Sequence, residues 1–350
     1  MGDLVKTNYG SFLVMVSDLL EQARRKTVRQ VNTVITYTYW KIGKLVVEEE
    51  QRGTNRAQYG EHLLQRLARD LTKKFGKGFT ETNLKYMRQF YLTYPIRHAL
   101  RDELTWTHYR LLLGIRDAKA RSFYEIEVVN NSWSTRELDR QINSLLFERL
   151  TLSKDKNKVM ELAKRGQIIE KPEDVIKDPY VLEFLGLPEK SYYTELQLEQ
   201  KLIDHLQEFI LELGKGFAFV ARQKRITIDN EHYYIDLVFY HRILRCLVLF
   251  DLKVGKLSHS DVGQMNFYLN YIKDREMFEG ESFPVGIILC TESNRSRVFV
   301  EYALGGLSNR VFVSKYKLYL PTKKELEIEV KKETARIKLT LPKKKENSRD

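Results

Sequence analysis

The first part of the chain, residues 9–150, carries apolar residues at helical spacing. Leucines recur three and four residues apart within 63–71, which is typical of one face of an amphipathic helix. We expect one helix over about 61–74 and a second that begins after Thr80, with a Gly-Lys-Gly turn between them. This half of the chain is therefore predicted to be an all-α domain.

The two helices around the glycine turn resemble a helix-turn-helix motif. The second helix of such a motif would present Asn83, Lys85 and Arg88 to a groove of DNA, and basic residues outnumber acidic ones around it. The alternative is an αα-hairpin with a solvated basic face, and helical periodicity alone favours that alternative. Both interpretations stay open, with DNA binding as the functional one.

Beyond Glu195 the hydrophobic period changes from that of helices to that of strands. An amphipathic helix that extends to about Leu213 leads into segments rich in β-branched and aromatic residues. We expect strands over 217–228, 233–240 and 247–252, a helix over 260–272 and a strand over 285–290, with Asp229-Asn230 as the first hairpin turn. This order predicts an α/β domain over residues 194–322, and the fold class is α+β with two domains.

Two other segments have the composition of connections. Residues 151–193 are rich in Lys and punctuated by Pro, which predicts a connector with short helices. Residues 323–350 consist largely of Lys and Glu and cannot bury a core, so they predict a basic mobile tail.

The overall charge favours a polyanionic partner. Lys and Arg number 59 against 47 Asp and Glu, which gives a formal charge of +12, and this excess is typical of proteins that bind nucleic acid. No apolar run approaches the roughly 20 residues that span a bilayer, and the start lacks a signal-peptide pattern. We therefore expect a cytoplasmic protein with no membrane partner.

Two common kinds of site have no support in the sequence. Cys246 and Cys290 lie within strand-like apolar runs, and the chain has no CxxC pair and no HExxH motif, so we expect no structural zinc. The Gly-Lys-Gly segments lack the following Lys-Ser or Lys-Thr of a Walker A loop, so we expect no ATP site.

Single charged residues interrupt two of the predicted strands. Asp236 lies within YYIDLVFY, and Asp251 and Lys253 lie within LVLFDLK. A carboxylate buried in a strand is costly unless it is paired or binds a metal. Because side chains alternate between the two faces of a strand, Asp251 and Lys253 lie on the same face. If the two strands form a hairpin, Asp236 can lie beside them.

Two carboxylates and an ammonium in one pocket have the composition of a phosphodiester hydrolase site. Asp236 and Asp251 would bind Mg²⁺ or Mn²⁺, which neutralises phosphate charge and lowers the pKa of water. Lys253 would orient the attacking water or stabilise the developing charge. The alternative is a salt bridge at the end of a strand, and the spacing alone does not choose between the two.

The arrangement of these three residues resembles the PD-(D/E)XK nuclease superfamily. Gln264-Met-Asn-Phe-Tyr268, on the following predicted helix, matches the QxxxY motif of the RecB-like branch. Over about residues 9–320 the chain is similar to the YhcG-type family of PD-(D/E)XK nucleases, in stretches that include YWKIGKLVVEEEQRG, GFTETNLKYMRQFY, IKDPYVLEFLGL, LELGKGFAFVARQKRITI and GQMNFYLNYI. The chain departs from the superfamily pattern at Ile235, which replaces Pro, and at Asp251, which replaces the more frequent Glu.

The resemblance implies an αβββαβ core, a divalent cation and DNA, duplex or branched, as the substrate. It also implies a metal-binding acid on the first helix of that core, for which Glu199 is the first choice and Glu195 the second. Either glutamate is alternatively part of a solvated helix face.

Two further pairs of residues acquire roles from the same resemblance. Gln264 and Tyr268, one turn apart, would face the pocket and steady Lys253 or the phosphate, and the alternative for them is helix packing. Arg222 and Gln223 match a family Arg-Gln pair that would contact nucleic acid.

These observations predict a Mg²⁺-dependent DNA endonuclease with an N-terminal DNA-binding domain. Two alternatives stay open: a catalytically silent nuclease fold that binds DNA or a protein, and a nuclease directed at RNA. A single site per chain often requires two chains to cut both strands of a duplex, so we also expect a homodimer.

Overall fold

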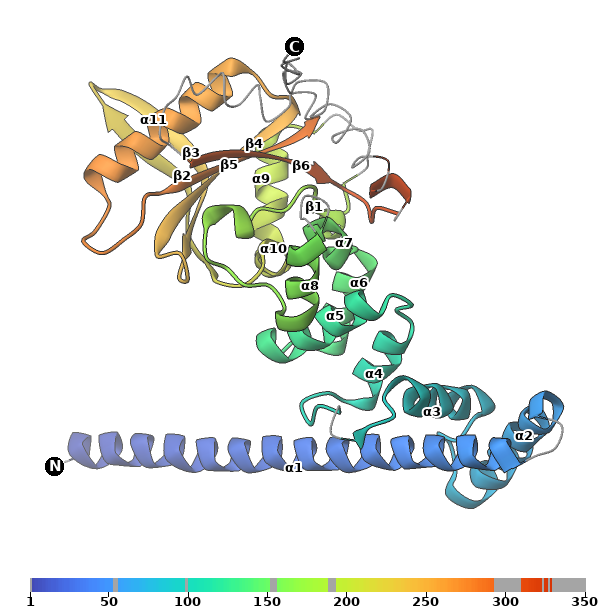
Figure 1. Cartoon of the computed structure of the whole chain (residues 1–350). Helices are drawn as coiled ribbons and strands as arrows, with labels where there is room; N and C mark the ends of the chain where they lie inside the picture. Colours follow the sequence, from blue (N-terminus) through green and yellow to red (C-terminus); the bar gives the residue numbers. More distant parts are fainter. Residues whose placement is uncertain are drawn as a thin grey trace, which may run out of the picture. The chain divides into compact units, whose positions relative to one another are not determined.

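The computed structural model describes residues 2–52, 56–97, 100–151, 156–187, 193–292, 310–322, 324–326 and 328 of the 350-residue chain. The chain divides into two compact units, Met1–Asp139 and Arg140–Asp350 (Figure 1). Each unit has apolar clusters of its own. The predicted tail over 323–350 lies almost entirely outside the described residues.

Unit 1 is helical, as its periodicity predicts. Its helices are α1 (Gly2–Arg52), α2 (Arg56–Phe75), α3 (Glu81–Thr93), α4 (Trp106–Leu113), α5 (Ala118–Asn131) and the start of α6 (Thr135–Asn143). The predicted glycine turn separates α2 from α3, and both Gly76 and Gly78 have positive φ angles. Thr80 caps α3 because its side chain accepts a hydrogen bond from the Asn83 N–H at 3.3 Å.

The C-terminal half of α1 packs closely against α3. A Cβ added at Gly43 would lie 1.9 Å from the carbonyl oxygen of Met87, so only glycine allows this approach. Val46, Leu64, Leu84 and Met87 form the buried cluster that joins α1, α2 and α3. Close backbone contact and apolar burial thus fix the position of α3 in unit 1.

Unit 2 is built on a six-stranded sheet in the part of the chain that the structure describes. Its strands, in spatial order, are β1 (Tyr180–Val181), β6 (Arg310–Lys317), β5 (Val285–Glu292), β4 (Cys246–Lys256), β3 (Glu231–His241) and β2 (Phe217–Ile228). Strands β2, β3 and β4 are antiparallel neighbours, whereas β4, β5, β6 and β1 pair in parallel. The expected turn at Asp229-Asn230 is present, with positive φ at both residues.

Several elements of unit 2 differ from the prediction. The helix expected from Glu195 to Leu213 is two helices, α9 (Glu195–Asp204) and α10 (Leu206–Leu213), which meet at His205. The predicted connector contains α8 (Lys156–Arg165) and two short 3₁₀ helices, and it also supplies β1. Strand β6 was not expected, whereas α11 (His259–Arg275) extends the predicted helix at both ends.

Two helical layers cover the faces of the sheet. Phe209 of α10 packs edge-to-face on Phe239 and Phe250, and this cluster also includes buried residues of α9. Met265 of α11 belongs to the cluster on the other face, where Gly286 of β5 leaves room for its side chain. The strands β3 and β4 therefore run between α9 on one side and α11 on the other.

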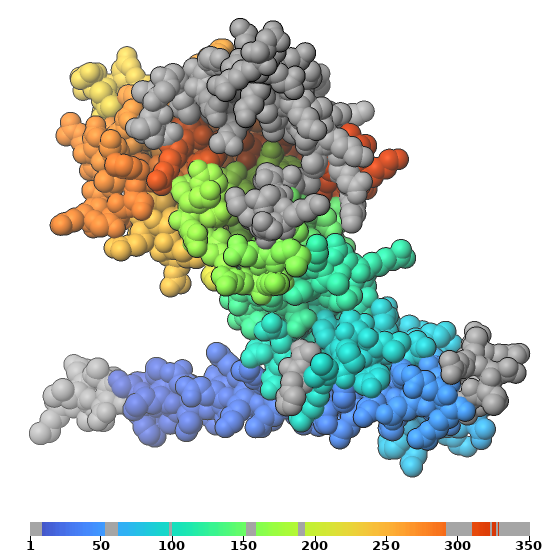
Figure 2. Space-filling model, in the orientation of Figure 1, coloured from blue at the N-terminus to red at the C-terminus, as the bar shows by residue number. Residues whose placement is uncertain are grey.

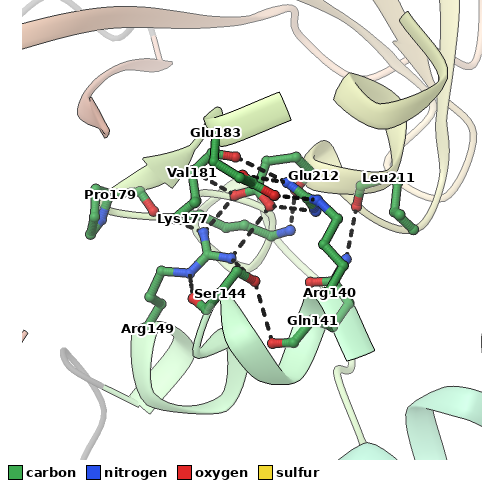
Figure 3. Close-up of polar contacts among 10 residues, drawn as sticks. All are labelled: Arg140, Gln141, Ser144, Arg149, Lys177, Pro179, Val181, Glu183, Leu211 and Glu212. Carbon is green, nitrogen blue, oxygen red and sulfur yellow. Dashed lines mark hydrogen bonds and ion pairs between the residues drawn. The ribbon is translucent and has the colours of Figure 1, made fainter. Parts of the chain in front are cut away.

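A buried ionic cluster joins the first helices of unit 2 to α10 (Figure 3). Glu212 is fully buried, and its carboxylate lies 2.5 Å from Arg149 of α7 (Leu146–Thr151) and 3.3 Å from Arg140. It also accepts the N–H of Val181 at 2.9 Å, and the Lys177 ammonium donates to the Glu212 carbonyl. Although burial favours the neutral acid, these cations lower the pKa of Glu212 to about 2.

No helix in the described ranges is both long enough and apolar enough to cross a membrane.

Candidate active site

The structure brings together the two aspartates and the lysine that interrupt the predicted strands. The β3–β4 ladder ends at the pair Leu237 and Phe250, and the next residues along the two strands are Asp236 and Asp251. One oxygen of Asp236 accepts the Leu252 N–H at 2.7 Å, so the side chain takes the place of a backbone partner on β4. The antiparallel pairing of β3 and β4, on which the prediction from the sequence depended, thus gathers these carboxylates.

Lys253 and Asp251 form the close ion pair of this site. The Lys253 ammonium lies 3.1 Å from Oδ2 of Asp251, whose side chain is 4% exposed. Burial raises the pKa of Asp251 to about 7 against the opposing effect of Lys253, and the neighbouring Asp236 carboxylate raises it further. Burial opposes the charge of Lys253 as well, but Asp251 and Glu195 raise the pKa of Lys253, which keeps the ammonium protonated.

Asp236 is held by two donors from different strands. Besides the Leu252 N–H, the side-chain amide of Gln223 donates to Asp236 Oδ1 at 3.1 Å. Burial raises the pKa of Asp236, while the Leu252 N–H and the Lys253 ammonium lower it. The carboxylate orientation is therefore fixed by its neighbours.

Gln223 connects the aspartates to helix α9. Its amide also donates to Oε2 of Glu199, a residue that is 2% exposed, so one amide bridges Glu199 and Asp236. Gln223 has a φ of 42°, which is unusual for a non-glycine residue inside a strand, and such strain often marks a functional position. Arg222 pairs with the other oxygen of Glu199, with its Nε at 3.2 Å.

Both candidate acids of α9 border the site, in different ways. Glu195 Oε2 lies 3.8 Å from the Lys253 ammonium, and Oε1 accepts the Val254 N–H at 3.1 Å. Glu199 reaches Asp236 only through Gln223. The structure therefore places Glu195 beside the lysine and Glu199 beside the aspartate.

Gln264 and Tyr268 meet each other and strand β3. The Gln264 amide donates to the Tyr268 hydroxyl at 2.7 Å, and this hydroxyl donates to the carbonyl of Tyr234 at 2.9 Å. Tyr234 precedes Asp236 by two residues. This contact anchors the strand that carries Asp236 and agrees with the packing alternative, while a role in steadying Lys253 or the phosphate stays a prediction.

The donor set fits a hard divalent cation at the two aspartates. Oδ2 of Asp251 and Oε1 of Glu199 are buried without a hydrogen-bond partner, although each faces a cation. In the described part of the chain, however, no three His, Cys, Asp or Glu groups form a ready metal cluster. The Gln223 amide bridges Glu199 and Asp236, so the three-carboxylate set expected from the sequence is not preassembled. Mg²⁺ commonly takes one or two carboxylates and completes its shell with water and substrate phosphate, which suits Asp236 and Asp251.

Gln223 is the residue whose role the sequence did not reveal. The resemblance predicts a contact with nucleic acid, whereas in the structure the amide is engaged by Glu199 and Asp236. No local pattern signals a left-handed residue at this point of β2. Its position between two strand residues with normal pairing, Arg222 and Lys224, becomes visible only in the sheet.

The three predicted DNA-contacting residues of unit 1 lie on α3. Asn83 donates to the Gly78 carbonyl at 2.6 Å and accepts from the Trp106 indole at 3.1 Å. Arg88 pairs with Glu50 of α1 at 2.6 Å. Lys85 lies 2.7 Å from Glu81, and its side chain is 55% exposed. All three residues thus have partners within unit 1, and Lys85 is the one of them with the most exposed side chain next to its ion pair.

Comparison with known proteins gives family matches for both parts of the chain. Residues 173–332 match the YhcG PDDEXK nuclease domain, and residues 15–149 match the DUF1016 N-terminal domain. The curated protein "Putative nuclease YhcG" of Escherichia coli (strain K12) is 42% identical over 340 residues, which cover 88% of this chain and 90% of that protein.

Two solved structures show weak likeness to part of the chain. One is a crystal structure of a repair endonuclease from Pyrococcus abyssi, with a TM-score of 0.25 and 18% identity over 38% of this chain and 50% of that one. The other is the structure of an EndoMS-dsDNA2 complex, with a TM-score of 0.26 and 18% identity over 39% and 49% of the two chains. Each match spans about half of the solved chain.

Proposed function

Since the chain belongs to the YhcG family of PDDEXK nucleases, we propose that it is a Mg²⁺-dependent endonuclease that hydrolyses phosphodiester bonds of DNA. The observation that carries the proposal is the meeting of Asp236, Asp251 and Lys253 where β3 and β4 diverge, with 3.1 Å between the lysine and Asp251. Mn²⁺ has the same preference for oxygen ligands and would serve in place of Mg²⁺.

Asp236 and Asp251 are the residues that would hold the cation. A divalent ion bound there supplies charge neutralisation at the phosphate and a water of lowered pKa. The protein's contribution is orientation, because Asp236 is fixed by the Leu252 N–H and by the Gln223 amide. Burial of Asp251 excludes competing water and makes an added positive charge favourable at that carboxylate.

Lys253 has the position of the residue that stabilises charge on the scissile phosphate. Its ammonium is kept protonated by Asp251 and Glu195, and its side chain is 18% exposed, so it is anchored and still borders solvent. As negative charge grows on the phosphate oxygens, a fixed ammonium stabilises the transition state more than the ground state.

The remaining site residues support this arrangement from three elements. Tyr268 of α11, oriented by Gln264, holds β3 at Tyr234, two residues before the first aspartate. Arg222, whose side chain is 40% exposed beside Glu199, is proposed to contact the DNA backbone at the rim of the site. Glu199 is proposed to join the metal shell only when the Gln223 amide moves aside.

Unit 1 is proposed to bind the duplex through α3 and its basic surroundings. Lys85, whose side chain is 55% exposed beside its partner Glu81, is the residue of this helix proposed to meet a phosphate, while Asn83 and Arg88 hold the helix in position. The net charge of the chain supports binding that weakens as salt concentration rises.

A second candidate function is a nuclease fold that binds DNA or a protein without cutting. It is favoured by one observation: each acidic group of the site already has a protein partner, Lys253 for Asp251 and Arg222 for Glu199. Titration calorimetry with Mg²⁺ and Mn²⁺ separates the two functions. Metal uptake at millimolar concentration that disappears in Asp236→Ala supports the nuclease, and no uptake supports the binding module.

The substrate is tested by parallel digestion of supercoiled plasmid, branched and linear DNA oligonucleotides, and structured RNA. The proposal expects Mg²⁺-dependent cuts in DNA and little change in the RNA. Cleavage of the RNA alone would make the chain an RNA-directed nuclease with the same site chemistry.

A further inference from the structure

The N-terminal half of α1 carries apolar side chains that the rest of unit 1 leaves uncovered. In Figure 2 this segment, in blue, has no other helix of unit 1 over it along the face that is visible. Tyr9 is 65% exposed, Leu20 55% and Val34 64%, and these residues span more than six helical turns. A row of large apolar groups over such a length is typical of a surface that binds another protein.

Five of the exposed apolar residues, Tyr9, Leu13, Val16, Leu20 and Val34, lie on one seven-residue repeat. Alternating steps of four and three residues select Tyr9, Leu13, Val16, Leu20, Ala23, Thr27, Gln30 and Val34, which lie on one stripe of the helix. We call these eight residues the α1 stripe. The stripe is apolar from Tyr9 to Leu20 and again at Val34, whereas Ala23, Thr27 and Gln30 between them are small or polar, so it has the spacing of a coiled-coil seam with a less apolar section.

The α1 stripe faces away from the part of α1 that packs within unit 1. Thr36, Trp40 and Val47 are buried, and Gly43 approaches Met87 of α3, so these four residues mark the packed face. Val34 precedes Thr36 by two residues, which places it about 200° away around an α-helix. A partner can therefore lie along the stripe without displacing α3.

The charges along this segment are divided between its two halves. Residues 9–23 contain Asp18 and Glu21 and no Lys or Arg, whereas residues 24–35 contain Arg24, Arg25, Lys26 and Arg29 and no acid. Two of these cations also pair within the chain, Arg24 with Glu21 at 3.3 Å and Arg29 with Glu103 at 2.7 Å, at exposed positions where such pairs add little stability.

We propose that the α1 stripe binds the same stripe of a second copy of this chain, with the two helices antiparallel. An antiparallel pair brings the acidic half of each helix beside the basic half of the other, whereas a parallel pair would align four cations with four like cations. The helix dipoles are also favourably opposed in the antiparallel arrangement. The partner is thus a second copy because the segment is complementary to itself.

Side-chain size agrees with this arrangement. If the two-fold axis passes between Glu21 and Gln22, Leu20 lies opposite Ala23 and Val16 lies opposite Thr27 of the other chain. These two larger residues of the first half then meet smaller ones of the second, as a well-packed interface requires. A parallel pair would instead place Ala23 and Thr27 opposite themselves and leave gaps.

The dimer would carry two nuclease sites, a consequence that rests on the proposed function. Each chain contributes one group of Asp236, Asp251 and Lys253, and a duplex has two strands to cut. The pairing itself does not depend on cleavage, so it is tested by mass and by cross-linking.

The first experiment is sedimentation of the full-length chain over a range of concentrations. We expect a species of about twice the 41.5 kDa chain mass, and Leu13→Glu with Leu20→Glu should weaken dimerisation by roughly 100-fold or more. Val14→Glu is the matched control, because Val14 is also exposed but lies about 100° from Leu13. A chain that is monomeric throughout, or a dimer that persists in the double variant, overturns the proposal.

The second experiment distinguishes the two helix directions. In the antiparallel pair Tyr9 lies opposite Val34 of the other chain, while the two Tyr9 residues are about 37 Å apart along the axis. Mixed Tyr9→Cys and Val34→Cys chains should therefore cross-link to each other, and neither variant should cross-link to itself. Self-cross-linking of Tyr9→Cys would show a parallel pair, and binding to anionic vesicles by a monomeric chain would show a membrane surface; either result overturns the proposal.

Discussion

The ammonium of Lys253 lies 3.1 Å from the carboxylate of Asp251, two residues away on the same face of β4. Removal of one member of such a largely buried pair leaves the charge of the other uncompensated. A structural salt bridge and a catalytic pair respond differently to this loss, because only the catalytic pair also loses cleavage when the lysine is removed.

Lys253→Met should decrease DNA cleavage by about 100-fold or more while increasing the affinity for Mn²⁺. The ammonium no longer competes with the cation for Asp251, and its effect on the phosphate is lost. Titration calorimetry measures the affinity for Mn²⁺, and a plasmid assay measures the rate of DNA cleavage. Lys256→Met, on an exposed position of the same strand, is the control and should change neither; unchanged cleavage by Lys253→Met contradicts the assigned role.

Gln223→Gly should fold but cleave DNA about 10- to 100-fold more slowly than the wild-type chain. Glycine accepts the positive φ of this position without strain, so the variant isolates the loss of the amide that orients Asp236. Single-turnover cleavage measures the effect on catalysis, and thermal unfolding measures the effect on stability. Gln223→Ala should also lose stability, because alanine is disfavoured at this backbone angle. Full activity in the glycine variant would show that the amide is dispensable.

The buried cluster around Glu212 should make unit 2 sensitive to acid. Because the pKa of Glu212 is lowered to about 2 in the folded chain, its contribution to stability is complete above the unfolded value of about 4.5 and is lost as the pH falls towards 2. This lowering of the Glu212 pKa corresponds to about 3 kcal/mol of unfolding free energy. Urea unfolding at several pH values measures the dependence.

Glu212→Gln is the variant that isolates this carboxylate. It should lower the free energy of unfolding at pH 7 by about 3 kcal/mol, since Arg149 and Lys177 lose their buried counter-charge. The same variant should flatten the pH dependence between 4.5 and 2. If wild type and variant lose stability in parallel over this range, the cluster is not the source of the acid sensitivity.

Gly43→Ala should destabilise unit 1 by about 2 kcal/mol, because the new methyl group meets the Met87 carbonyl and α3 must shift. Gly10→Ala is the matched control on the same helix, since nothing lies within 4 Å of an added Cβ, and it should be neutral or stabilising. Hydrogen exchange of α3 amides measures the difference. Equal protection in both variants would contradict the close packing of α1 on α3.

Local patterns predicted much of the fold and the centre of the site. Alternating apolar residues and the Asp229-Asn230 turn between β2 and β3 are local signals that gave the strands, whereas the position of Asp236 beside Asp251 depended on the further assumption that β3 and β4 form a hairpin. The two-residue strand β1 carries no such signal, because its backbone partners are supplied by β6. For the same reason the helix break at His205 and the left-handed conformation of Gln223 appear only in the assembled sheet and its covering helices.

The choice of the helix acid shows the same limit. Glu195 and Glu199 lie one turn apart on α9, so periodicity gives them similar positions. Their roles differ because Gln223 and Arg222 approach Glu199 from β2, whereas Glu195 meets Lys253 of β4. Contacts with residues of β2 and β4, which are distant in the sequence, thus determine the different roles of Glu195 and Glu199.

The most direct test of the account is cleavage of supercoiled plasmid by the wild-type chain and by Asp251→Ala, with Mg²⁺ and with EDTA, together with the DNA affinity of each. We predict nicked or linear DNA only from the wild type with Mg²⁺, and affinities within a few fold of each other. Equal cleavage by Asp251→Ala, or cleavage by the wild type in EDTA, would contradict a metal-dependent site built on Asp236, Asp251 and Lys253.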